Sequence, residues 1–166
     1  MKKPAAFLDR DGVINIDTGY VYKIEDFKWI KDAKEAIKYI KNKGFLVIVI
    51  TNQSGITRGY YSEKDVINLH KHINNQLANL NTQIDEFFYS PFHPDVKNEK
   101  YNHLSHLRKP NTGMIELATE KWSIDLDNSF LIGNSDTDIQ CAENYGIIGY
   151  LYKEGSLLDF IKKIIP

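Results

Sequence analysis

Hydrophobic residues along this chain follow two alternating patterns. Short, mostly apolar runs occupy residues 4–8, 45–50, 84–89, 129–132 and about 147–151. Runs of this length are typical of buried strands. The run 45–50 is apolar throughout, as expected of a strand that helices cover on both faces. We therefore predict five strands.

Between these runs, apolar residues recur every three or four positions, the spacing of one helical face. The clearest series are Ala33, Ala36, Ile37 and Ile40, followed by Val66, Leu69, Ile73 and Leu77. Three more helices are predicted from Thr112 to Trp122, from about Thr137 to Tyr145, and from Leu157 to Ile164.

Several residues next to these helices are suited to the helix ends. Asp32 and Thr112 are candidate N-terminal caps. Ser62, with Asp65 three residues later, resembles a capping box. Gly44 is expected to close the first helix, because glycine commonly follows a helix C-terminus.

Strands and helices alternate along the chain without repeats or low-complexity linkers. This order predicts an α/β fold, a Rossmann-like parallel sheet flanked by helices on both faces. Residues 13–29 and 90–107 are expected to form loops, and neither is long enough for a large cap domain. We therefore predict a single domain over residues 1–166.

Composition narrows the possible functions. The chain has 166 residues, a formal net charge of -1 and one cysteine, Cys141. This charge gives no basic surplus for nucleic acid or an acidic membrane, and no stretch approaches the roughly 20 apolar residues of a membrane helix. One cysteine cannot form an intramolecular disulfide, so Cys141 is expected in the core of a protein from a reducing compartment. Because Asp9 and Arg10 interrupt the apolar run that a signal peptide needs, we expect a cytoplasmic protein.

Two carboxylates follow the first predicted strand. Asp9 and Asp11 are separated by one residue, so on an extended backbone their side chains project to the same side. Acidic residues after a strand also occur in ordinary turns. Two adjacent carboxylates repel each other, however, and a hard divalent cation such as Mg²⁺ takes oxygen ligands.

Polar groups also follow the other predicted strands. Thr51 and Asn52 follow the second, Arg108 and Lys109 come after the third, and residues 134–138 follow the fourth. The carboxyl ends of strands in a wound sheet meet at one edge, where ligands bind. Carboxylates, a hydroxyl and two cations gathered there suit phosphoryl transfer.

These motifs, in this order, resemble the haloacid dehalogenase superfamily of phosphatases. They are Asp-x-Asp-Gly, a strand ending in Thr-Asn, Lys-Pro, and Gly-Asn-x-x-x-Asp, and the resemblance covers about residues 5–152. Phe-Leu-Asp-Arg-Asp-Gly, Thr-Asn-Gln-Ser-Gly-Ile-x-Arg-Gly and Arg-Lys-Pro-x-x-Gly-Met are similar to D-glycero-D-manno-heptose 1,7-bisphosphate phosphatases. The histidinol-phosphatase domain shares much of this pattern.

The resemblance implies a covalent mechanism. Asp9 would attack phosphorus to form an aspartyl-phosphate, and Asp11 would serve as general acid and then as general base. Thr51 and Lys109 would hold the phosphoryl oxygens, contacts that can each lower the barrier by ~3 kcal/mol. Mg²⁺ is the implied cofactor, with the candidate ligands Asp9, Asp11 (through its backbone carbonyl), Asn134 and Asp138.

The resemblance also implies a set of substrate contacts. It comprises Arg10, Asp17, Thr18, Gly19, Tyr20, Asn52, Gln53, Ser54, Arg108 and Ser135. Arg108 is suited to a bidentate grip on a second phosphate or on hydroxyls; alternatively it is a solvated surface arginine.

The chain departs from the family at the fourth motif. Asn134 stands where the family has an aspartate that supplies a carboxylate to Mg²⁺. An amide oxygen can still coordinate, so we expect metal binding that is retained but weaker. Asp136 or Asp138 can compensate, or Asp138 orients the ligands or Lys109 instead.

A second departure concerns zinc. The family often carries a Cys-x-His and Cys-x-Cys zinc loop before Arg-Lys-Pro, and the corresponding residues here are Ser90, Phe92, Ser105 and Leu107. No thiolate is left, so no structural zinc is predicted. His93, His103 and His106 in the same loop are interpreted as surface residues, although the His-x-x-His spacing permits a metal.

The resulting hypothesis is a Mg²⁺-dependent sugar-phosphate phosphatase that removes the 7-phosphate of a heptose 1,7-bisphosphate. Its expected partner is a small phosphorylated sugar, with no nucleic acid and no membrane, and a monomer is expected. Histidinol phosphate is an alternative substrate. Asn134 also permits a pseudo-phosphatase that binds phosphorylated ligands without turnover.

Overall fold

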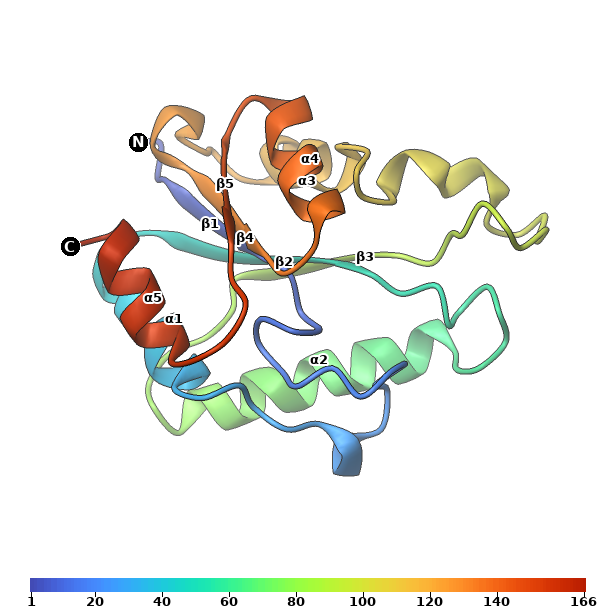
Figure 1. Ribbon diagram of the computed structural model, residues 1–166, viewed down its shortest axis with the longest axis horizontal. Coiled ribbons are helices and arrows are strands. Elements are labelled where there is room, and N and C mark those ends of the chain that lie inside the picture. Colours follow the sequence, from blue (N-terminus) through green and yellow to red (C-terminus); the bar gives the residue numbers. More distant parts are fainter.

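The predicted strands form one parallel sheet. A computed structural model describes residues 1–166 and orders the strands β3-β2-β1-β4-β5 (Figure 1). Every neighbouring pair is parallel. All five predicted strands are present, with the bounds β1 Ala5–Leu8, β2 Leu46–Asn52, β3 Glu86–Ser90, β4 Phe130–Gly133 and β5 Ile148–Leu151.

The five predicted helices are also present, in two layers. Figure 1 shows α1, α2 and α5 on one side of the sheet and α3 and α4 on the other. This confirms the predicted α/β fold. The helices are α1 Ala33–Asn42, α2 Glu63–Ala78, α3 Gly113–Lys121, α4 Asp136–Tyr145 and α5 Leu157–Ile164. No helix combines the length and apolar character needed to cross a bilayer.

Side-chain alternation along the strands divides the core in two. In β1, Ala6 and Leu8 pack with the layer that contains α1, α2 and α5, whereas Ala5 and Phe7 pack with α3 and α4. All four residues are fully buried. A strand covered on both faces needs apolar residues at every position, which explains the continuous runs in the sequence. Cys141 belongs to the second layer and is buried, as predicted.

The register of the central strands brings distant motifs to one edge. Leu8 at the end of β1 is paired with Val49 of β2 and with Ile132 of β4. The chain winds outward from β1 to β2 and β3 and then crosses to β4 on the other side of β1. The segments after β1 and β4 therefore flank the point where the strand order reverses, the usual place for a ligand in such a sheet.

The predicted helix ends are only partly correct. Ser62 and Asp65 form the capping box: the Asp65 N–H donates to Ser62 Oγ at 3.2 Å, and the Ser62 N–H donates to Asp65 Oδ2 at 2.9 Å. Gly44 follows α1 with a φ of 88°, as expected for a closing glycine. Asp32 was a wrong prediction, because its backbone is left-handed (φ 59°) and its side chain caps nothing. Thr112 was also wrong, because its hydroxyl donates to the Glu116 carboxylate instead of accepting from the backbone.

The loops predicted at 13–29 and 90–107 contain short 3₁₀ turns, Ile24–Asp26 and Asn102–Leu107. The second loop packs on a separate apolar cluster, whose members are Ile56, Tyr61, Val66 and Tyr101, with Tyr22, Tyr89 and Leu104 against it. Tyr101 of this loop also donates a hydrogen bond to the Glu63 carboxylate at 3.5 Å. Aromatic packing therefore holds this loop against the start of α2.

The contrast between Ser62 and Thr112 can be measured. Ser62→Ala is expected to lower the free energy of unfolding by about 1 kcal/mol, because it leaves an N-terminal N–H of α2 without its acceptor. Thr112→Ala removes the same type of group without removing a cap and is expected to cost clearly less. Urea denaturation followed by circular dichroism measures both losses, and equal losses would contradict this difference between the two helix starts.

Candidate active site

A cleft of about 390 Å³ opens at the carboxyl edge of the sheet. It collects twelve of the predicted site residues, which come from the loops after β1, β2 and β4 and from the Lys109 segment. They are Asp9, Asp11, Asp17, Gly19, Tyr20, Asn52, Gln53, Ser54, Lys109, Asn134, Ser135 and Asp138. Tyr61 and Thr137 also line it and were not predicted.

Lys109 is the buried cation of the cleft. Its Nζ lies 3.0 Å from Asp9 Oδ1 and 2.7 Å from Asp138 Oδ1, and it donates to the Ile50 carbonyl at 2.9 Å. Burial alone lowers the pKa of Lys109, but the carboxylates of Asp9 and Asp138 outweigh burial and raise that pKa above its usual value. The ammonium charge is therefore fixed between the segments that follow β1 and β4.

Asp9 is the less compensated of the two carboxylates. Burial raises its pKa to about 7, and the Lys109 ammonium opposes the rise, whereas the charges of Asp138 and Asp11 add to it. Burial also acts to raise the pKa of Asp138, but there Lys109 outweighs burial and the pKa is lowered. Asp9 therefore carries a charge that further positive charge in the cleft would stabilise.

Asp138 organises the turn between β4 and α4. Its Oδ2 accepts from the backbone N–H groups of Asn134 (3.1 Å) and Ser135 (3.2 Å) and from the Ser135 hydroxyl (2.9 Å). Its Oδ1 faces Lys109. Because Oδ2 accepts three hydrogen bonds from the turn and Oδ1 lies against the Lys109 ammonium, this geometry favours the orienting interpretation of Asp138 over direct metal ligation.

Asp11 is held by donors from three directions. Asp11 Oδ1 accepts from the Asn15 amide at 3.0 Å, and Oδ2 accepts from the Gln53 amide at 2.9 Å. Arg10 donates to both oxygens through Nη2 at 3.1 and 3.2 Å. The Asp11 side chain is still 21% exposed, so these contacts fix the carboxylate while it faces the cleft.

Arg10 does not match its predicted role in substrate binding. Its side chain is fully buried, and it is absent from the lining of the cleft. The guanidinium is occupied by Asp11, by the Val21 carbonyl at 2.6 Å and by the His70 ring. Arg10 therefore holds Asp11 from the protein interior and does not face the cleft.

The segment after β2 mixes lining and supporting residues. Thr51 is buried beneath the cleft surface, and its Oγ1 accepts from the Gln53 amide at 2.8 Å. The Asn52 side chain binds the Lys109 backbone in both directions, accepting from its N–H at 3.0 Å and donating to its carbonyl at 3.2 Å. Gln53 also accepts a hydrogen bond from the Tyr61 hydroxyl. These contacts connect β2 to Asp11 and Lys109.

One wall of the cleft comes from the loop after β1. The Gly19 N–H donates to Asp17 Oδ1 at 2.9 Å, and Gly19 has a φ of 87°, a conformation that suits glycine. The Tyr20 ring packs edge-on against Tyr60 with 4.9 Å between centroids. Thr18, a predicted substrate contact, is exposed and does not line the cleft.

Arg108 also lies outside the lining of the cleft, within a cluster of basic residues. Burial lowers its pKa first, and the charge of Arg58 lowers it further. Burial and then Arg108 and Arg58 likewise lower the pKa of His93. Arg108 donates to the Phe92 carbonyl at 3.3 Å, and Arg58 Nε is buried without a hydrogen-bond partner. The Asp95 carboxylate lies near Arg108 and His93 and acts in the opposite direction on both pKa values. Burial and the two arginines outweigh it, so this basic cluster (Arg58, His93 and Arg108) is suited to an anion.

The sequence analysis did not identify three supporting residues, Asn15, Tyr61 and His70. Asn15 is fully buried and donates to Asp11. His70 occupies the buried face of α2 with Val66 and Leu69, so its signal was a histidine at a helical core position. No group of three or more His, Cys, Asp or Glu side chains is arranged to hold a metal ion.

Comparisons with known proteins identify the family of the chain. Residues 5–148 match a family model described as polynucleotide kinase 3 phosphatase. The chain is 42% identical over 139 residues to a D-glycero-beta-D-manno-heptose-1,7-bisphosphate 7-phosphatase of Photorhabdus laumondii, covering 84% of this chain and 74% of that protein. It is also 42% identical to that organism's D-glycero-alpha-D-manno-heptose-1,7-bisphosphate 7-phosphatase, covering 88% and 80%.

A solved structure is similar over nearly the whole chain. It is the D,D-heptose 1,7-bisphosphate phosphatase of B. bronchiseptica complexed with magnesium and phosphate, with a TM-score of 0.80 and 27% identity. The match covers 98% of this chain and 87% of that one. The chain therefore belongs to the family of haloacid dehalogenase-type phosphatases, enzymes that hydrolyse phosphoric monoesters.

Proposed function

We propose that this enzyme removes the 7-phosphate from D-glycero-D-manno-heptose 1,7-bisphosphate through an aspartyl-phosphate on Asp9. The observation that carries the proposal is the buried Lys109 ammonium 3.0 Å from Asp9, in a cleft that Asp11 also lines. Relatives named for the beta and the alpha anomer are equally similar to this chain, so the proposal covers both anomers.

The positions of the two carboxylates in the cleft support the following chemistry. An Asp9 oxygen attacks phosphorus, and the bond between phosphorus and the sugar oxygen breaks. Asp11 gives its proton to the departing sugar oxygen and then takes one from water as that water attacks the aspartyl-phosphate. The second step releases inorganic phosphate and regenerates Asp9. Lys109 balances the negative charge around the reacting group.

The donors at the cleft fit a magnesium ion. Asp9, Asp11 and Asn134 present the oxygen atoms that Mg²⁺ prefers. Burial raises the pKa of Asp9 by more than the Lys109 ammonium lowers it, which supports a place for further positive charge beside Asp9. A bound Mg²⁺ would supply positive charge to Asp9 and to the phosphoryl oxygens. Because Asn134 is neutral, we propose weaker affinity than an aspartate there would give.

The basic cluster supports a substrate with a second phosphate. Arg108 directly precedes Lys109 in the chain, and Arg58 follows the lining segment 52–54. The partnerless Nε of Arg58 and the mutual repulsion of Arg58 and Arg108 would both be relieved by an anion. The same cluster disfavours histidinol phosphate, the alternative substrate, because its amino group is cationic.

The first prediction from this proposal concerns turnover. Purified protein with Mg²⁺ is expected to release phosphate from a heptose 1,7-bisphosphate with higher kcat/KM than from histidinol phosphate, fructose 1,6-bisphosphate or a 3′-phosphorylated oligonucleotide. Asp9→Asn is expected to abolish release, because an amide is a far weaker nucleophile. Phosphate binding without turnover by the folded wild type would instead identify a pseudo-phosphatase.

The second prediction concerns the basic cluster. Arg108→Gln is expected to raise KM for the bisphosphate about tenfold or more, because a hydrogen bond to a charged group is worth about 1.5–3 kcal/mol. KM for p-nitrophenyl phosphate, which has no second phosphate, should change little. The matched control is Lys97→Gln, which removes an exposed charge from the same loop. An equal factor of increase in KM for both substrates would contradict a second-phosphate site at Arg108.

The third prediction concerns pH and magnesium. The pKa of Asp9 is about 7 in the folded protein against an ordinary 3.8, so the folded state keeps a proton that the unfolded state loses in this window. Asp9 therefore contributes stability at low pH that is lost as the pH rises from about 4 to about 7. In EDTA, the free energy of unfolding should fall more for wild type than for Asp9→Asn between pH 5 and pH 7.

The effect of Mg²⁺ on the melting temperature tests the same carboxylate. Added Mg²⁺ at pH 7 should raise the melting temperature of the wild type more than that of Asp9→Asn, because the ion binds the ionised carboxylate. Two results would show that Asp9 does not cause these effects. One is a difference in the free energy of unfolding between wild type and Asp9→Asn that does not vary with pH, and the other is an equal rise in melting temperature of both proteins with Mg²⁺.

A further inference from the structure

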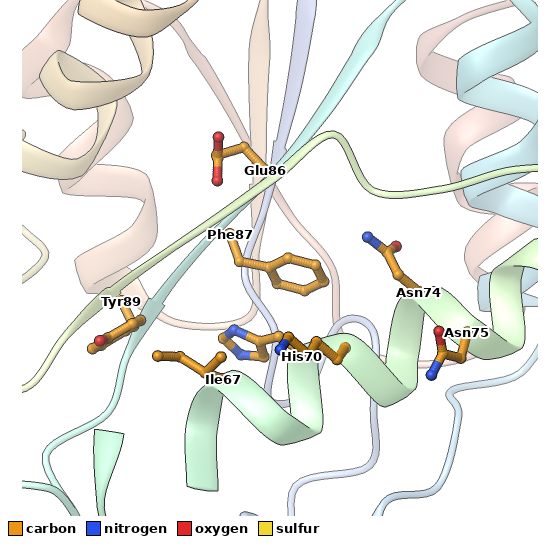
Figure 2. A pocket seen from close by; sticks show the side chains of 8 residues that line it. Ile67, His70, Asn74, Asn75, Glu86, Phe87 and Tyr89 are labelled. Atoms are coloured by element: carbon orange, nitrogen blue, oxygen red, sulfur yellow. The ribbon is translucent and has the colours of Figure 1, made fainter. Parts of the chain in front are cut away.

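A second cavity, of about 420 Å³, lies between α2 and the edge strand β3, outside the active-site cleft. Figure 2 shows His70 of α2 in this cavity, next to Phe87 of β3. The two rings stack with 4.3 Å between centroids and 15° between planes. His70 is only 6% exposed, so its ring lies between the cavity and the interior.

The inner side of the His70 ring faces Arg10. The distance from Arg10 Nη1 to His70 Nε2 is 3.2 Å. A guanidinium group has donors and no acceptor, so Nε2 must accept this hydrogen bond, and the ring proton must be on Nδ1. Burial and then the charge of Arg10 hold the pKa of His70 well below its usual value, which agrees with a neutral ring.

Arg10 has few alternatives to this partner. Its side chain is fully buried, so water cannot replace a lost acceptor easily. Nη2 donates to the Val21 carbonyl at 2.6 Å and to Asp11, and Nε donates to Asp11 at 3.3 Å. His70 and Val21 therefore hold the guanidinium through Nη1 and Nη2, while Nε and Nη2 donate to the Asp11 carboxylate.

We infer that His70 is a positioning residue for the phosphatase reaction: it fixes Arg10, and Arg10 in turn orients the Asp11 carboxylate toward the cleft. The inference rests on the proposed role of Asp11 as the general acid. His70 itself does not line the cleft. A misaligned acid slows proton transfer to the leaving oxygen, so the effect should depend on how much that oxygen needs the proton.

A pair of aryl phosphates tests this dependence without knowledge of the natural sugar. p-Nitrophenolate leaves readily without a proton, whereas the more basic phenolate of phenyl phosphate needs one. kcat/KM reports the step in which the leaving group departs. His70→Leu, which removes the acceptor, is expected to lower kcat/KM about tenfold for phenyl phosphate and less than about threefold for p-nitrophenyl phosphate.

Two further variants separate positioning from simple packing. His70→Gln keeps an acceptor oxygen for Arg10 and is expected to recover most of the phenyl phosphate activity. His72→Leu is the matched control, because His72 lies on the same helix and the only hydrogen bond of its side chain is with Gln76. It should leave both substrates unchanged. If His70→Leu does not fold, His70→Phe replaces it, since phenylalanine keeps the ring that stacks on Phe87 but has no acceptor.

The outcomes that would overturn the inference are specific. Equal losses on the two esters, or a His70→Gln variant no better than His70→Leu, would reduce His70 to a packing role. Asp11→Asn, assayed in parallel, identifies a failure of the underlying proposal. If Asp11→Asn itself shows no greater loss on phenyl phosphate than on p-nitrophenyl phosphate, then Asp11 is not the acid, and the inference about His70 fails with it.

Discussion

The site depends on one buried positive charge. Lys109 Nζ contacts Asp9 after β1, the Ile50 carbonyl in β2, and Asp138 in α4. A buried ammonium without partners is strongly unfavourable, so these three segments must meet wherever Lys109 is buried. The same contacts that neutralise the lysine bring the nucleophile candidate to the cleft. Fold and site are therefore coupled through this ion-paired group.

A second buried cation supports Asp11 in a different way. Arg10 uses its planar fork on the Asp11 carboxylate and satisfies its other donors with Val21 and His70. A lysine could not provide this geometry, because its ammonium is a point charge without a fixed fork. Lys109 and Arg10 thus approach the carboxylates from the protein interior, which leaves the opposite side of Asp9 and Asp11 open to the cleft.

The sequence predicted those parts of the fold and site that depend on residues close together in the chain. A strand covered on both faces must be apolar throughout, so the runs at 5–8 and 46–50 identify β1 and β2 without tertiary information. The placement of Asp9 and Asp11 on one side also follows from strand alternation. β1 itself ends at Leu8, and the guanidinium of Arg10, the residue between them, reaches His70 of α2. Its charge and its place in the motif instead suggested a substrate contact.

Other features depend on contacts between distant segments and could not be predicted from sequence. The pairing of Arg10 with His70 joins residues 60 positions apart, and only the packing of α2 on the sheet brings them together. Asp32 looks like a cap in sequence, but the chain enters α1 with this residue in a left-handed conformation, and its side chain makes no capping hydrogen bond. Thr51 was expected at the phosphoryl group, whereas the Gln53 side chain covers its hydroxyl.

The net charge of the site shows what a neutral residue at position 134, Asn134, changes. Asp9, Asp11 and Asp138 face Lys109 and Arg10, so the ionised site carries one excess negative charge. A carboxylate at position 134 would add a second, next to a group whose pKa burial and neighbouring carboxylates already raise. With a divalent ion of the kind proposed, the site with Asn134 would be net positive by one charge rather than neutral. The amide thus weakens the attraction for the metal and strengthens the attraction of the loaded site for a phosphate dianion, two effects of opposite sign on the same reaction.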